Sequence, residues 1–175
     1  MTEPFKHYQL SSKKWNRELY NTLEDGTLFV GIDINHAYLR TAYLKGYIGK
    51  RVYEKLMDPK YKGVRNKALA CLNTYKKIYE YEEGVIVSQY EEGDASLAAA
   101  YLEIRTVTYK LMDDIAALVG PELFLKYHTD CLYVLPAAAG VVQAEIEKAN
   151  YGWKINECGK MRGEMFYDGD EIKDF

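Results

Sequence analysis

The chain has 175 residues and a mass of 20.2 kDa, which suffices for one compact domain with a sizeable core. Its net charge of −3 argues against coating of nucleic acid through bulk positive charge, and no apolar run approaches the roughly 18 residues of a membrane span. Cys71, Cys131 and Cys158 fit neither a disulfide framework nor a paired-cysteine zinc site, and Met1–Ser12 lacks the features of a secretory signal. We therefore expect a soluble, cytoplasmic protein without membrane partners.

Basic residues are concentrated between Lys45 and Lys77. The cluster is compatible with a local basic face and equally with a solvated helical surface. Arg65 and Lys67 stand near the start of an expected helix, where cations oppose the helix dipole. That placement indicates an external anion as their partner.

The first half of the chain predicts one strand followed by three helices. Residues 28–33 are rich in strand formers and end at Asp33, which is followed by Asn35 as a helix cap. Apolar spacing predicts helices over 36–47, 50–57 and 64–79. Residues 85–89 are expected to form a short strand or a connection.

The second half predicts a long helix and two hairpins. Residues 94–118 carry one apolar stripe, with Asp94 or Ser96 as cap and Gly120-Pro121 as stop. A hairpin is predicted from 123–127 and 132–135, followed by a short helix over 139–150. The chain is then expected to form a second hairpin from 153–157 and 164–167, which turns around Gly159-Lys160, and to end in a loose tail at 168–175. This order predicts an α+β domain whose helices cover one face of an antiparallel sheet.

One segment within this framework resembles the first palm motif of family B DNA polymerases. It is Asp33-Ile34-Asn35-His36-Ala37-Tyr38, a strand that ends in an aspartate with a tyrosine five residues later. The resemblance implies that Asp33 binds both catalytic metals. It also implies that Tyr38 is the steric gate that excludes ribonucleotides.

A second segment, Leu72-Asn73-Thr74-Tyr75, is similar to the fingers-helix motif of the same family. The resemblance implies that Asn73 binds nucleotide and that Lys67 meets the incoming triphosphate, with Arg65 beside it. The spacing departs from the family pattern, because Lys67 lies two residues too far from Asn73 and Lys76 stands where glycine is usual.

The third segment, Tyr127-His128-Thr129-Asp130-Cys131, looks like the family's Tyr-x-Asp-Thr-Asp-Ser hairpin with His128 in place of the first aspartate. The metal-binding aspartate then falls at Asp130. Lys160 resembles a lysine that contacts the primer end, and His128 is a second candidate contact to nucleic acid.

Together the segments imply a reduced polymerase, with a palm-like antiparallel sheet over 28–167, a fingers-like helical insertion at about 48–84 and an N-terminal extension at 1–27. Two carboxylates on adjacent strands can hold two Mg²⁺ or Mn²⁺ ions for phosphoryl transfer.

The partners that the resemblance implies are a DNA primer-template and deoxynucleoside triphosphates. No room remains for an exonuclease or a thumb, so another chain or self-association would supply the grip on DNA.

Two other interpretations remain open. A catalytically inactive palm-like subunit of a replication complex is favoured by His128, the irregular second motif and the negative charge. A metal-dependent nuclease with a ribonuclease H-like sheet could begin with Val30-Gly31-Ile32-Asp33. It requires antiparallel strands directly after Asp33.

Overall fold

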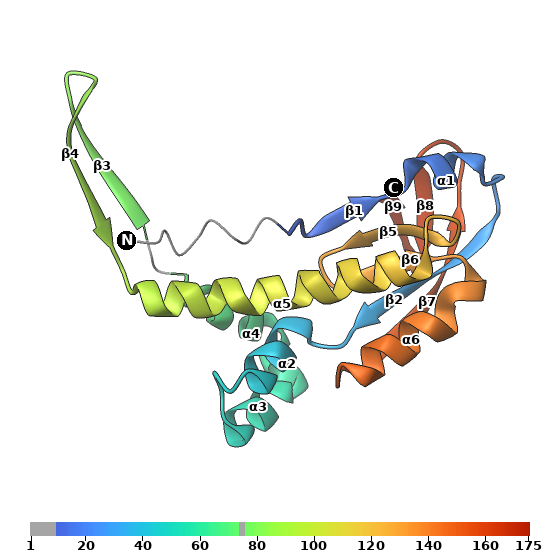
Figure 1. Cartoon of the computed structure of the whole chain (residues 1–175), viewed down its shortest axis with the longest axis horizontal. Helices are drawn as coiled ribbons and strands as arrows, with labels where there is room; N and C mark the ends of the chain where they lie inside the picture. The colour runs from blue at the N-terminus through green and yellow to red at the C-terminus, as the bar shows by residue number, and fades with distance from the viewer. Residues whose placement is uncertain (1–9, 74–75) are drawn as a thin grey trace. The chain divides into compact units, whose positions relative to one another are not determined.

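The computed structural model describes residues 10–73 and 76–175. The expected α+β class is confirmed (Figure 1). The chain divides into two compact units. The first unit covers residues 38–107 of this described part, and the second combines 10–37 with 108–175. Within the described ranges, no helix is both long and apolar enough to cross a membrane.

The second unit contains an antiparallel sheet of seven strands in the order β1-β5-β6-β2-β7-β8-β9. The strands are β1 (Lys13–Trp15), β2 (Leu28–Ile34), β5 (Phe124–His128), β6 (Cys131–Val134), β7 (Trp153–Lys160), β8 (Met165–Asp168) and β9 (Glu171–Asp174). The predicted strand at 28–33 and the hairpin that follows residue 120 are confirmed. The central position of β2, between β6 and β7, is a result of tertiary pairing that its sequence alone does not indicate.

Two helices pack on one face of this sheet, whereas a third packs on the other, so the prediction that the helices cover a single face is only partly right. Alternate residues of β2 and β6, such as Ile32 and Leu132, point into a buried cluster with Met112 and Ile115 of α5 (Ala95–Val119) and Val142 of α6 (Ala139–Lys148). Figure 1 shows α6 beside β2 and β7. The 3₁₀ turn η2 (Pro136–Ala138) leads directly into α6. The predicted helix at 139–150 is thereby confirmed, and it buries its apolar stripe as the spacing requires.

The opposite face carries a second, aromatic cluster. Tyr20 of α1 (Arg17–Thr22) stacks on Phe175 with ring centroids 3.7 Å apart. Phe29 and Phe166 are fully buried beside them. Residues near both ends of the described chain therefore share one core.

The last strands differ from the sequence prediction. Gly159 and Lys160 lie within β7 rather than in a turn, and the chain reverses at residues 161–164. Residues 171–174 form β9, which pairs with β8, so the expectation of a loose tail is wrong. The short alternating segment around Ile172 gains its order from this pairing and not from local propensity.

The first unit combines a small helical cluster with a two-stranded hairpin and the first part of α5. It contains α2 (Ala37–Leu44), α3 (Lys50–Met57), the 3₁₀ turn η1 (Pro59–Tyr61) and α4 (Lys62–Ala70). Leu39, Ala42, Leu69 and Ile104 form its buried centre. The boundaries of α3 agree with the prediction, including its end at Asp58-Pro59.

The helix predicted over 64–79 ends at Ala70. Residues 76–82 instead form strand β3 (Lys76–Glu82), which pairs with β4 (Val85–Glu92). Tyr79 and Tyr81 alternate with Glu80 and Glu82, and this period of two competes with the helical spacing that extends from α4. Glu83 and Gly84 close the turn with positive φ angles of 49° and 83°, and a two-residue turn of this kind favours a hairpin.

Helix α5 begins where the sequence predicted. The Asp94 carboxylate accepts hydrogen bonds from the backbone N–H groups of Ser96 and Leu97 at 2.8 and 3.2 Å, as an N-cap does. The apolar spacing predicts a stripe that runs from Leu97 through Ile104 and Ile115 to Leu118. This is only partly right, because Leu97 and Leu118 are exposed, whereas Met112 and Ala116, outside the predicted stripe, are buried.

Candidate functional site

A polar cavity of about 620 Å³ opens in the second unit, and all of its lining residues belong to that unit. Five carboxylates line it, against two ammonium groups. The acidic residues are Asp33, Asp130, Asp168, Asp170 and Glu171, and the basic residues are Lys154 and Lys173. An excess of negative charge of this kind favours a cation in the cavity.

The pleat of the sheet positions the floor of the cavity. Asp33 on β2 is paired with Cys131 on β6 and with Lys154 on β7, so the three side chains form a row across adjacent strands. Because Ile32 and Ile34 face the helices, Asp33 faces the opposite side of the sheet. At Gly31, two residues before Asp33 on the same face, the ring of Tyr133 packs against the backbone, and a Cβ there would lie only 3.0 Å from this ring.

Asp130 reaches the same cavity from the tip of the β5–β6 hairpin. Its carbonyl accepts a hydrogen bond from the backbone N–H of Ile34 at 2.8 Å, which ties the tip to the end of β2. Thr129 before it has a φ of 59°, a value that is unfavourable for a β-branched residue. The backbone N–H of Thr129 is held by the Ser12 carbonyl at 2.7 Å. Such strain accompanies sites whose geometry is held by the surrounding structure.

The two predicted aspartates interact electrostatically. Burial, and secondarily the charge of Asp33, raises the pKa of Asp130 to about 6. The Lys154 ammonium lies 3.2 Å from the Asp33 carboxylate, and this ion pair raises the pKa of Lys154. A carboxyl group perturbed by burial and by a like charge, in a cavity, has the character of a functional residue.

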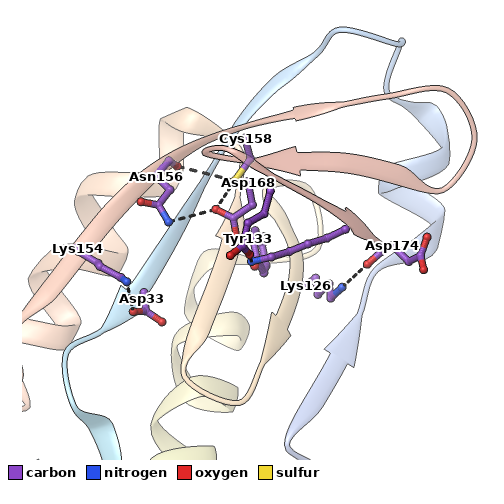
Figure 2. A network of polar contacts seen from close by, with 10 residues as sticks. Asp33, Lys126, Tyr133, Lys154, Asn156, Cys158, Asp168 and Asp174 are labelled. Carbon is purple, nitrogen blue, oxygen red and sulfur yellow. Dashed lines mark hydrogen bonds and ion pairs between the residues drawn. The ribbon is translucent and has the colours of Figure 1, made fainter. Parts of the chain in front are cut away.

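A third carboxylate of the cavity is Asp168 at the end of β8, which is held by a network of hydrogen bonds (Figure 2). It accepts hydrogen bonds from Lys173 at 2.6 Å, Tyr133 at 2.8 Å and Asn156 at 3.2 Å. Burial opposes the charge of Asp168, but the hydrogen bonds from Lys173 and Tyr133 outweigh it and lower the pKa of this carboxyl group. Asp168 is therefore an ionised group that fixes the wall of the cavity.

Two other cavity residues have defined protonation states. Burial, with the nearby charges of Lys126 and Lys13, lowers the pKa of His128, so its imidazole is neutral at pH 7. Burial raises the pKa of the Cys131 thiol to about 12. A protonated thiol is a poor nucleophile, so thiolate chemistry is not expected at this site.

The residues of the cavity fit a divalent cation in part. Asp33 and Asp130 supply carboxylate oxygens, and Mg²⁺ in phosphate chemistry is commonly held by one or two carboxylates together with water and substrate phosphates. Across residues 10–73 and 76–175, no three His, Cys, Asp or Glu side chains gather closely enough to form a metal cage of their own. A cation here would depend on a substrate for further ligands.

Lys160 does not line the cavity. Its ammonium donates to the carbonyls of Tyr20 and Leu23 at 3.0 and 2.5 Å and lies over the Tyr20 ring. In this fold Lys160, which belongs to β7, links the sheet to α1 through these hydrogen bonds. Contact with a primer end would require it to leave these partners.

The predicted nucleotide-binding residues belong to the first unit. Tyr38 is in α2, Lys67 is exposed on α4, and Asn73 is exposed just after α4. Arg65 is only 5% exposed and donates to the Leu56 carbonyl at 3.4 Å, so it links α4 to α3. Thr74 and Tyr75 of the second motif lie outside the described residues.

Sequence reasoning missed Asp168, Lys154, Tyr133 and Lys173. Lys154 could have been found from the strand register, because it lies directly opposite Asp33 in the β2–β7 pair. Asp168 carried no comparable signal. The Asp168-Gly169-Asp170 sequence resembles an ordinary turn, and its burial depends on the pairing of β8 with β7.

Comparison with known proteins identifies no relative. No protein-family model matches the chain, and neither a curated protein nor a solved structure is similar to it.

Proposed function

We propose that this protein is a minimal nucleotidyltransferase of the family B DNA polymerase type, which adds deoxynucleotides to a DNA primer. The observation that carries the proposal is the meeting of Asp33 and Asp130 in one cavity, with the pKa of Asp130 raised to about 6 by burial and by Asp33. The two residues are 97 positions apart by their numbers in the sequence. Both lie in segments that resemble palm motifs, which occur in the order and approximate spacing of the family.

The arrangement of the site supports the same conclusion. The two aspartates come from β2 and from the tip of the β5–β6 hairpin. Asp33 faces away from α5 and α6, which pack on the other side of the sheet. This arrangement is compatible with the palm-like antiparallel sheet that the resemblance implies. Phosphoryl transfer requires mainly positioning and electrostatics, which a small domain can supply.

Asp33 and Asp130 would hold Mg²⁺ or Mn²⁺, whose chemistry at such sites is to lower the pKa of a primer hydroxyl and to stabilise charge on pyrophosphate. Lys154 holds the Asp33 carboxylate in position through their ion pair. Asp168 and Lys173 keep the wall of the cavity fixed. The roles that the resemblance implies for Tyr38, Lys67 and Asn73 concern the first unit by itself, and they stay predictions.

The second candidate function is a catalytically inactive palm-like subunit. Two observations favour it, namely His128 at the position of the first hairpin aspartate and the lack of a third metal-binding side chain among the described residues. The nuclease interpretation is less favoured, because β2 is followed by helix α2 and not by the antiparallel strands that it requires.

The test is extension of a primed DNA template by the purified chain with deoxynucleoside triphosphates and Mg²⁺ or Mn²⁺. We expect extension by the wild type and its loss in Asp33→Asn and Asp130→Asn, which keep the side-chain shape but remove the charge. Asp114→Asn is the matched control, because Asp114 is exposed and pairs with Lys110 on the surface of α5, outside the cavity. Tyr38→Ala should increase incorporation of ribonucleotides.

The outcomes separate the candidates. Extension that persists in both aspartate variants would refute the assignment of the site. A wild-type protein that binds primed DNA without extending it would support the inactive subunit instead.

A further inference from the structure

The β3–β4 hairpin exposes large apolar side chains on both of its strands. Tyr79, Tyr81 and Ile86, which share one face, are 43, 64 and 49% exposed. Among the described residues, these two strands pair only with each other (Figure 1). A two-stranded hairpin alone is marginally stable, and an exposed apolar patch on it indicates an interaction surface.

The two outer edges of the hairpin are not equivalent. In β4 the pairing skips Val87, because Glu80 pairs with Ser88 while Tyr81 pairs with Ile86. This bulge distorts the β4 edge, and bulges are a common means of blocking further pairing. β3 has no extra residue, so its edge is the one suited to accept another strand.

The charges of the hairpin restrict the partner. It carries five glutamates and only two lysines: Glu80, Glu82, Glu83, Glu91 and Glu92 against Lys76 and Lys77. This excess of negative charge opposes nucleic acid as the occupant. The sign of the charge also changes along β3, with lysines at its start and glutamates towards its end.

We propose that the β3 edge binds the β3 edge of a second copy of this chain, in an antiparallel pair centred on Tyr79. In this register Lys76 lies opposite Glu82 of the second copy, and symmetry repeats the pair at the other end. Lys77 lies opposite Tyr81, where an ammonium can contact the ring, and Tyr79 lies opposite its own counterpart. If β4 instead paired with β4 of a second copy, Glu91 and Glu92 would lie opposite Ile86 and Val85. That arrangement would bring no lysine opposite a glutamate.

The paired hairpins form one continuous sheet with an extended apolar surface. Tyr79, Tyr81 and Ile86 share a face of the hairpin, because Tyr81 pairs with Ile86 and Tyr79 lies two residues before Tyr81. The two-fold axis brings the Tyr79 side chains of both copies together on that face. Cross-strand aromatic pairs of this kind stabilise sheets.

Charge reversal tests the register. Glu82→Lys places two lysines opposite each other at both ends of the pair, and Lys76→Glu places two glutamates there, so each single variant should run as a monomer by light scattering while the wild type runs as a dimer. An equimolar mixture of the two variants should form a mixed dimer, because both of its end pairs again join Lys to Glu. Circular dichroism of each variant checks that the fold is retained.

A cross-link tests the centre of the pair. In a Cys71→Ser background, which removes the exposed native thiol, Tyr79→Cys should form an intermolecular disulfide on mild oxidation. Tyr81→Cys is the matched control, because its two copies would be too far apart for a disulfide.

Three results would overturn the proposal. They are a wild-type chain that stays monomeric up to its solubility limit, single variants that remain dimeric, or a mixture of the single variants that does not associate.

Discussion

At the scale of the residue, Asp130 makes the stability of the fold depend on pH. Burial and Asp33 raise its pKa from 3.8 to about 6, so the folded state retains a proton that the unfolded chain releases between these values. The wild type therefore loses stability as the pH rises through this window, and the loss is complete above about pH 6.

Asp130→Asn removes this penalty. We expect the variant to exceed the wild type at pH 7.5 by about 1 to 3 kcal/mol in the free energy of unfolding, and to match it near pH 4. Urea unfolding at both pH values measures the difference, with Asp114→Asn as the control. An equal advantage at both pH values would contradict the electrostatic cause. Under the proposed function, Mg²⁺ should narrow the difference at pH 7.5, because it relieves the repulsion from Asp33.

Asp168 has the opposite character. Its pKa is lowered by Lys173 and Tyr133 against the effect of burial, so its stabilising charge is present above its ordinary pKa and is lost as the pH falls below that value. Asp168→Asn should destabilise the fold at pH 7 by about 1 to 3 kcal/mol, since Lys173 and Tyr133 lose their charged acceptor. The deficit should shrink in acid. Asp170→Asn, in the exposed turn beside it, should change little in the same urea measurement.

At the scale of the element, the β5–β6 hairpin holds Thr129 in the left-handed region at a φ of 59°. Thr129→Gly should relieve this strain and leave stability unchanged or raised by up to about 1 kcal/mol, although glycine costs entropy in most other positions. Thr129→Val keeps the branching and should give no such relief. Thermal unfolding compares the two variants. A glycine variant less stable than the valine variant would show that the strained conformation is not costly.

Elements whose stability is mostly local could be predicted from the sequence. Helix α3 and the start of α5 follow from periodicity and from the Asp94 cap. Local pattern predicts a helix where β3 forms, because Leu69, Leu72 and Ile78 continue a helical spacing from α4 into β3. Residues 76–82 nevertheless pair with β4. Strand β9 was missed because only its pairing with β8 orders it. Where partner strands decide the structure, local pattern is insufficient.

At the scale of the whole molecule, the candidate site was predictable only in part. The motif resemblance predicts Asp33 and Asp130 as a pair of metal-binding residues, and both line the same cavity. Lys154 and Asp168 reach the same cavity through β7 and β8, whose pairing order no single segment encodes. Lys160 is predicted to contact a primer end from its position near the last hairpin. In the structure its ammonium instead donates hydrogen bonds to two carbonyls of the α1 region.

The core that joins residues near both ends of the described chain gives the last prediction. Phe175 is 6% exposed, stacks on Tyr20 and lies near Phe166, while the Lys126 ammonium lies 5.4 Å from the centre of its ring. Phe175→Ala should therefore lower the free energy of unfolding by about 3 to 5 kcal/mol, the usual cost of removing a buried ring. Ile172→Ala is the control, because Ile172 in the neighbouring β9 is 61% exposed and should cost no more than about 0.5 kcal/mol. Urea unfolding measures both variants, and similar losses in the two would show that Phe175 does not belong to the core.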